Sequence, residues 1–303
     1  MRSRYEHNGL VWLDLESPSR AEVQDIVNEF DIAPLVAEEL LLPSTKPRIE
    51  LYQGYMYLVL HFPALRHSHK SREQEIDFII GKNYLITTRY DTVDPLHNFS
   101  KIFEVNAVLD KSNIGDHGGY IFFYMLKKLY KSVEHEVEYV RHDLATIEEH
   151  VFSGEEVQMV AAISRSARDL LSLRQTIEPH REILHEFEET APRFFGDDFT
   201  PYTRTISNEY YRVHNHITRN IDFLHELRET NNSLLSTKQN ETMKTLTVIT
   251  AVLAPLSIIT GIFGISSSFI PIVNTPEGFW FVGLLMLIGA AGIVTIFKLK
   301  RWL

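Results

Sequence analysis

The sequence of 303 residues contains no cysteine, so neither disulfide bonds nor thiolate metal ligands contribute to its structure or chemistry. It also lacks charged side chains over two long stretches, Thr245–Pro276 and Gly278–Phe297, which only Glu277 separates. A helix needs about 20 largely apolar residues to cross the hydrocarbon core of a bilayer, and each stretch supplies that number. We therefore expect two membrane-spanning helices at the C-terminal end of an otherwise charged chain.

Basic residues flank this pair of stretches but do not occur in the segment between them. They are Lys238 and Lys244 before the first stretch, and Lys298, Lys300 and Arg301 after the second. Basic residues near the ends of spans remain on the cytoplasmic side. We expect a multi-pass protein of the inner or plasma membrane, with both termini cytoplasmic and an extracytoplasmic loop at residues 266–278. The opening run MRSRYEHNGLVW has no apolar segment of signal-peptide length.

The part of the chain before the uncharged stretches has more acidic than basic residues. The formal net charge of the whole chain is −10, although residues 245–303 hold one acidic and three basic residues. An acidic surface repels nucleic acid and attracts cations. The sequence also has no phosphate-binding glycine loop, GxSxG or HExxH motif, and no paired catalytic carboxylates. We expect neither a nucleic-acid partner nor an organic cofactor nor enzymatic activity.

Residues 1–110 alternate strand-like and helix-like runs, which predicts a cytoplasmic α/β domain. The runs LVWLDL, RIELYQGYMYLVLHFPAL and QEIDFIIGKNYLITTRY are rich in β-branched and aromatic residues, and a glycine breaks each of the last two. Between the first two lies SPSRAEVQDIVNEF, whose apolar residues have helical spacing. Ser17 is the expected N-cap of this helix, with Pro18 as its first residue.

Proline and glycine become scarce after Gly119, which predicts unusually long helices. The sequence predicts a long antiparallel hairpin that turns at VFSGEEV and ends at the turn APRFFGDDFTP, with Pro179 kinking its second arm or ending it early. A third helix begins near Tyr202 and meets no proline or glycine until Pro255, so we expect a stalk supported by other copies that continues into the first span. The class is thus an α+β membrane protein. Its predicted domains are residues 1–110 (α/β), 111–200 (hairpin), 201–265 (stalk and first span), 266–278 (loop) and 279–303 (second span and basic tail).

Small and polar residues follow one register of the stalk and the first span. Their spacings alternate between four and three, so they form one seam that faces a common axis. The members of this polar seam are Glu229, Ser233, Ser236, Asn240, Met243, Thr247, Thr250, Ala254, Ser257, Gly261 and Gly264. Dry packing of neighbouring helices also favours small residues. Because the register starts well before the uncharged stretch, we favour a pore over packing.

The run NETMKTLTVITAVLAPLSIITGIFGIS, with its proline-containing loop and the terminal KLKRWL, resembles the CorA superfamily of divalent cation transporters. The runs VWLDLESPSRAEVQDIVNEFDIAPL, KPRIELYQGYMYLVL and IDFIIGKNYLITT resemble the N-terminal part of the family in the same order. The resemblance therefore covers essentially the whole chain. It implies a homopentameric funnel in a lipid bilayer, whose first span lines the pore, whose second span faces lipid, and through which a hydrated divalent cation moves down its gradient.

The resemblance also implies roles for individual residues. Asn240 corresponds to a polar ring, and Met243 and Leu246 correspond to a hydrophobic gate at the cytoplasmic side of the pore. Glu229 lies where the family often has an acidic ring, and Ala254 replaces a bulky gate residue, so that constriction is expected to be wider here. The other pore-lining positions that it implies are Thr247, Thr250, Ser257 and Gly261.

The sequence departs from the family at the outer mouth of the pore. The signature Gly-Met-Asn is replaced by Gly264-Ile265-Ser266. A ring of Asn amides accepts hydrogen bonds from the waters that Mg²⁺ retains, whereas Ser is a shorter acceptor and makes a wider ring. The transported ion, Mg²⁺ or a transition metal such as Zn²⁺, Co²⁺ or Ni²⁺, therefore remains open. The alternative is a non-conducting membrane sensor or scaffold that binds a metal or a partner through its cytoplasmic domain.

Two further sets of residues are weaker candidates for metal binding. Asp91 and Asp94 in RYDTVDP match the kind of intersubunit regulatory site that the family uses, but Asp residues before a proline are also common in turns. Histidines at 214, 216 and 225 would form rings in an assembly, yet His214 and His216 lie on different helix faces. For these histidines a solvated or interface role is the simpler interpretation.

Overall fold

The computed structural model describes residues 2–44, 46–63, 73–91, 93, 96, 99–101, 115–264 and 278–300. The chain divides into two compact units, Met1–Arg228 and Glu229–Leu303. The strands are β1 (Arg2–His7), β2 (Leu10–Glu16), β3 (Arg48–Leu51), β4 (Tyr55–Pro63), β5 (Glu73–Gly81) and β6 (Tyr84–Arg89). The helices are α1 (Arg20–Phe30), α2 (Pro34–Glu39), α4 (Gly118–Phe152), α5 (Glu156–Ile177), α6 (His180–Phe195), the 3₁₀ helix η1 (Asp197–Phe199), α7 (Thr200–Gly264) and α8 (Gly278–Leu299).

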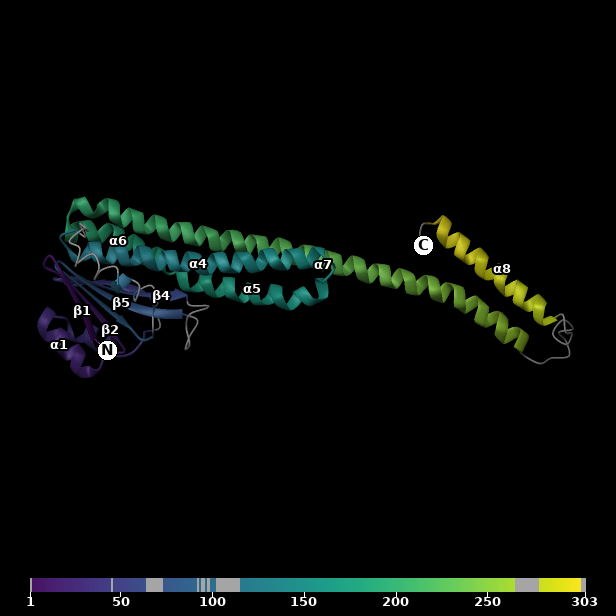
Figure 1. Ribbon diagram of the computed structural model, residues 1–303, viewed down its shortest axis with the longest axis horizontal. Coiled ribbons are helices and arrows are strands. Elements are labelled where there is room, and N and C mark those ends of the chain that lie inside the picture. Colours follow the sequence, from purple (N-terminus) through teal and green to yellow (C-terminus); the bar gives the residue numbers. More distant parts are fainter. Residues whose placement is uncertain are drawn as a thin grey trace. The chain divides into compact units, whose positions relative to one another are not determined.

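The first unit contains one six-stranded mixed sheet, which confirms the predicted α/β domain. The strand order is β1-β2-β6-β5-β4-β3, with β2 and β6 parallel and every other pair antiparallel. Strand β4 is buried along its whole length because both faces of the sheet are covered by helices. Figure 1 shows α1 and the long helix α4 on opposite faces of this sheet.

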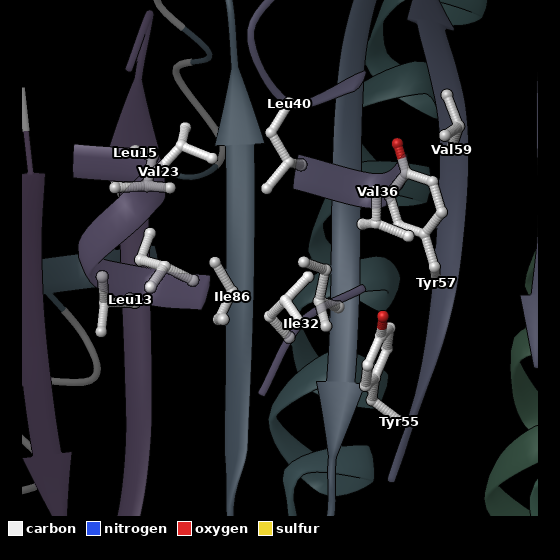
Figure 2. Close-up of a cluster of buried hydrophobic side chains, with 12 residues drawn as sticks. Leu13, Leu15, Val23, Ile32, Val36, Leu40, Tyr55, Tyr57, Val59 and Ile86 are labelled. Atoms are coloured by element: carbon white, nitrogen blue, oxygen red, sulfur yellow. The ribbon is translucent and has the colours of Figure 1, made fainter. Parts of the chain in front are cut away.

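Helices α1 and α2 cover one face through a compact apolar cluster. Figure 2 shows Val23, Ile32, Val36 and Leu40 lying against strand residues that point to the same side. Those strand residues are Leu13, Leu15, Tyr55, Tyr57, Val59 and Ile86. Their alternation with residues that point to the other face is the period of two that a strand imposes.

Helix α1 begins two residues later than the sequence predicts. Its N-cap is Ser19, whose hydroxyl accepts from the backbone N–H of Glu22 while the Glu22 carboxylate accepts from Ser19 N–H, which forms a capping box. Ser17 instead has a left-handed φ of 44° and donates its N–H to Arg89 O at the end of β6. The prediction was wrong because only Ser19 has a carboxylate three residues later.

The long helices agree with the scarcity of proline and glycine, with one exception. Helix α5 ends at Ile177 and α6 begins at His180, so Pro179 ends the helical arm early, as predicted. Pro192 does not end α6, which continues to Phe195. The predicted turn is present but begins only at Gly196, because buried side chains at helical spacing, including Phe187 and Ala191, hold the helix against the core. Helix α7 is a single helix of 65 residues, as the stalk prediction requires.

The core between the sheet and the long helices contains one fully buried histidine. Tyr130 donates its hydroxyl to His180 Nδ1 at 2.8 Å, and His180 Nε2–H donates to the carbonyl oxygen of His61 at 2.8 Å. Both ring nitrogens are therefore satisfied in the neutral tautomer. Burial lowers the pKa of His180 from 6.5 to about 3. A structural role follows, because the ring joins α4, α6 and β4.

We predict that acidification destabilises this core through His180. Below pH 6.5 the unfolded chain takes up a proton that the folded chain refuses until about pH 3, so stability falls as the pH falls through that window. The slope is at most ~1.4 kcal/mol per pH unit. Denaturant unfolding of the full-length protein in detergent at a series of pH values measures it. His180→Gln, which cannot be protonated, must flatten the dependence; an unchanged slope contradicts the assignment.

Candidate functional site

The second unit is formed by residues from Glu229 onward and contains both helices that are long and apolar enough to cross a membrane. These are α7, through its C-terminal part, and α8. Their large apolar side chains are mostly exposed: Ile258 is 63 % exposed and Leu287 67 %. An apolar surface this extensive requires lipid or further protein to cover it. The two predicted spans therefore coincide with the two helices that a single chain leaves uncovered.

Helix α8 covers one face of α7, and that face is not the polar seam. The least exposed large side chains of this part of α7 recur at helical spacing, at Val248, Val252, Leu256, Ile259 and Phe263. Facing them, α8 contributes Met286, whose sulfur lies 3.9 Å from the Thr260 hydroxyl oxygen. This apolar stripe fixes the rotation of α7 relative to α8. Every residue of the polar seam from Glu229 to Gly264 lies outside the stripe and is exposed.

Three hydroxyl groups of the seam donate their hydrogens back to their own helix. Thr247 donates to Met243 O at 2.8 Å, Thr250 to Leu246 O at 2.9 Å, and Ser257 to Leu253 O at 3.0 Å. With its hydrogen engaged in this way, each oxygen presents only lone pairs outward. The seam is therefore a row of hydrogen-bond acceptors on an otherwise apolar helix.

The two glycines of the seam are not required by contacts within the chain. A Cβ atom built at Gly261 or Gly264 meets no atom within 4 Å in the described part of the chain. Their backbone φ values are helical rather than left-handed. Packing and backbone conformation of one chain thus give no reason for glycine at these positions, and the reason must be sought in a neighbouring copy or in water.

Pro255 adds a further acceptor in the same region. It lies inside α7 and lacks the N–H group that would bond to the carbonyl oxygen of Ala251. A carbonyl freed in this way inside a membrane helix is tolerated where it meets protein or water. It therefore strengthens the expectation that this part of α7 contacts other polar partners.

Only some of the site residues predicted from the sequence lie within the described residues. Gly264 is the last described residue of α7, so Ile265 and Ser266 of the altered signature lie outside the described residues. Met243 and Leu246, the expected gate residues, are 54 % and 56 % exposed on α7. Asn240 is exposed on the same helix. The roles of these three residues in a ring and a gate stay predictions.

The predicted regulatory metal site is only half described. Asp94 lies outside the described residues, whereas the backbone carbonyl of Asp91 accepts from Arg89 at 3.1 Å. The same guanidinium binds Asp14 at 3.2 Å and Glu16 at 3.1 Å, at the ends of the parallel strands β2 and β6. No group of three or more His, Asp or Glu residues that could hold a metal ion occurs within the described ranges. The site at Asp91 and Asp94 stays a prediction.

Sequence reasoning missed two features that the structure makes plain. The first is the α8-facing stripe, whose signal is the four- and three-residue spacing of large apolar residues from Val248 to Phe263. The second is a pair of buried acids, Glu75 and Asp77, in β5. Their signal is the alternation of QEIDFII, which places both carboxylates on the same face as the buried Ile79.

Comparison with known proteins gives one consistent answer. The family model of the "CorA-like Mg2+ transporter protein" matches residues 7–301. The cobalt/magnesium transport protein CorA of Thermotoga maritima is 26% identical over 295 residues, which cover 97% of this chain and 83% of that protein. The putative metal ion transporter YfjQ of Bacillus subtilis is 24% identical over 298 residues, covering 96% and 89%.

The same likeness extends to the three-dimensional fold. The structure of the CorA magnesium transporter from Methanocaldococcus jannaschii aligns with a TM-score of 0.83 and covers 99% of this chain and 93% of that chain. The sequence identity is 20%, so this comparison concerns the fold. An N-terminal α/β domain, a long helix and two C-terminal apolar helices are common to both.

We predict that water reaches the polar seam but not the adjacent side of α7. Because the chain has no cysteine, a single introduced cysteine is the only thiol that a reagent can label. In membranes, Ser257→Cys is expected to react on the order of tenfold faster than Ile258→Cys with a charged thiol reagent, since the reactive thiolate forms only where water enters. Mass spectrometry of the labelled protein measures both rates. Equal rates would mean that the seam is buried in dry packing.

Proposed function

The chain belongs to the CorA-like Mg²⁺ transporter family, and from this premise we propose that it conducts divalent cations through a pore lined by helix α7. Members of this family are transporters, so the expectation that the chain is not an enzyme is confirmed. The observation that supports the pore is the exposed polar seam, which α8 leaves uncovered. Several copies that bring their seams to one axis would cover it.

We infer a homopentamer in a bilayer, the assembly that the resemblance to the CorA superfamily implies. Five copies of one seam would enclose an axial passage that a single chain cannot form. The passage would begin at Gly264, Ile265 and Ser266 and continue past Gly261 and Ser257. It would then pass Ala254, Thr250 and Thr247, the constriction at Met243 and Leu246, and finally Asn240 and Glu229. Ala254 leaves its level wide, so the Met243–Leu246 level is the narrow apolar gate.

The seam hydroxyls, whose hydrogens are bonded to their own helix, favour a cation that keeps its hydration shell. Waters around a cation point their hydrogens outward, and the seam oxygens at Thr247, Thr250 and Ser257 present lone pairs to them. Mg²⁺ loses its water reluctantly, so a passage that accepts hydrogen bonds from the hydration shell avoids the cost of removing it. Repeated acceptors along the seam also let the ion leave one level for the next.

The orientation in the membrane follows from charge. We propose that both termini and the acidic first unit are cytoplasmic, because Lys238, Lys244 and Lys298 flank the spans on one side. The glutamate at position 229 and the amide at 240 would then lie at the cytoplasmic exit.

The stalk, loop and tail boundaries at residues 201–265, 266–278 and 279–303 remain part of this proposal. A regulatory metal between Asp91 and Asp94 of adjacent copies is also part of it.

Flux into proteoliposomes tests the proposal. Wild-type protein should admit at least one of Mg²⁺, Co²⁺, Ni²⁺ and Zn²⁺ faster than protein-free liposomes. Ser257→Leu removes an acceptor and narrows the passage, and should lower flux at least about tenfold, the effect of about 1.4 kcal/mol on a barrier. Ile258→Leu, the adjacent position off the seam, serves as the matched control. Flux that survives Ser257→Leu and Gly261→Leu would contradict the pore assignment.

A second prediction concerns ion choice at the outer mouth. Replacing Ser266 by Asn restores the longer amide acceptor to the altered signature and should raise the preference for Mg²⁺ over Co²⁺ and Ni²⁺. Competition between these ions for uptake in the same liposomes measures the preference. If Ser266→Asn leaves the order of ions unchanged, the residue at position 266 does not select the ion.

A further inference from the structure

Several buried polar atoms that lack hydrogen-bond partners among the described residues belong to one place on the sheet. They are Ser44 Oγ, His61 Nδ1, Glu75 Oε2, Asp77 Oδ1 and Thr88 Oγ1. Glu75 and Asp77 point to the same face of β5. Across the ladders, His61 pairs with Glu75 and Thr88 pairs with Asp77. Buried polar groups are normally satisfied, so a gathering of exceptions requires an explanation.

Two carboxyl groups form the centre of this gathering. Asp77 is 1% exposed and Glu75 8%. Asp77 Oδ2 accepts from the Tyr90 hydroxyl at 3.0 Å, and that hydroxyl also lies 3.2 Å from the backbone oxygen of Glu39. Asp77 Oδ1 accepts no hydrogen bond from any residue that the structure describes.

The second carboxyl group holds the segment that follows α2. Glu75 Oε1 accepts from the backbone N–H of Ser44 at 2.9 Å. Glu75 Oε2 lies 3.1 Å from His61 Nε2, close enough for an ion pair but without the alignment of a hydrogen bond. The same nitrogen instead lies 3.2 Å from the carbonyl oxygen of Ser44. Together with the Tyr90–Glu39 contact, the buried groups of the sheet thus touch both ends of residues 39–44.

The charges around the pair do not neutralise two carboxylates. From β4 the facing groups are His61 and Tyr57, and from α2 the facing group is Glu39. From β3 comes Arg48, whose guanidinium already binds Glu39 and Glu50. After β6 comes Tyr90, a neutral donor. Among the described residues, one cation at most, on His61, faces the pair directly, and an unneutralised carboxylate is costly to bury.

We propose that Glu75 and Asp77 form a proton-binding site that fastens residues 39–44 to the sheet, and that this segment loosens when the site loses its proton. With the proton on Asp77, its Oδ1 becomes a donor toward an acceptor oxygen of Glu75 or Thr88. Two of the unpartnered atoms then satisfy each other. The site belongs to the first unit and does not depend on the proposed transport.

The direction of the pH dependence follows from linkage. Burial raises the pKa of Asp77 well above 3.8, and the charge of Glu75 raises it further, whereas the hydrogen bond from Tyr90 acts against them. The folded site therefore binds more protons than the unfolded chain, and its stabilisation is lost as the pH rises toward the folded pKa. Burial acts to lower the pKa of His61, but its contacts with Glu75 outweigh this and raise it, so the histidine changes stability in the same direction.

Infrared spectroscopy of the full-length protein in detergent tests the proton directly. Wild-type protein at neutral pH should show the carbonyl absorption of a protonated buried carboxyl group, and Asp77→Asn should remove it. Asp14→Asn is the matched control, because Asp14 is a buried carboxyl group that the Arg89 guanidinium pairs at 3.2 Å. Absorption that is absent from the wild type, or that survives in Asp77→Asn, overturns the proposal.

Hydrogen exchange tests the fastening. After correction for intrinsic rates, exchange of the peptide containing Ser44 should quicken with pH by up to about tenfold per pH unit. His61→Gln removes the contribution of the histidine to the pH dependence of exchange. Adding Asp77→Asn to this variant should abolish the pH dependence that remains. An exchange rate that does not depend on pH, but that falls when MgCl₂ is added at constant pH, would show that the cluster is a metal site and overturn the proposal.

Discussion

One constraint determines most of what this structure implies: a membrane helix with a polar face cannot leave that face in contact with lipid. Helix α8 covers an apolar stripe of α7 from Val248 to Phe263, and the polar seam lies on another face. One chain offers the seam no partner within the described ranges, and Gly261 and Gly264 face open space. The proposed assembly of several copies around water and a hydrated ion would cover this face.

In the first unit the polar groups that need partners are buried in the core rather than exposed to lipid. His180 is satisfied by Tyr130 and by the carbonyl oxygen of His61, so a neutral ring suffices. Elsewhere on the sheet, Asp77 keeps one oxygen without a partner among the described residues, and a proton resolves the imbalance. One buried titratable group of this fold is thus held neutral by neighbours that complete its hydrogen bonds, whereas another keeps a hydrogen bond incomplete.

The sequence predicted the elements better than their contacts. Scarcity of proline and glycine was sufficient for the 65-residue α7, and the uncharged stretches were sufficient for both spans. Ser17 was misjudged as an N-cap because capping depends on the residue three positions later and on a backbone bond to Arg89 that pattern cannot reveal. The strand order and the meeting of His61, Glu75 and Asp77 depend on pairing between distant segments. The seam was visible as a period, but the face that α8 covers was not, since it depends on which of the two apolar sides of α7 contacts α8.

The most direct test of the central claim is the current through purified protein in a planar bilayer that separates two concentrations of MgCl₂. If copies of α7 enclose a cation pathway, Mg²⁺ diffuses to the dilute side, and that side becomes positive at zero current. A potential of opposite sign would show that chloride carries the current, and the absence of any current would show that no open pathway exists. Either result would contradict a divalent cation pore along the seam of Thr247, Thr250 and Ser257.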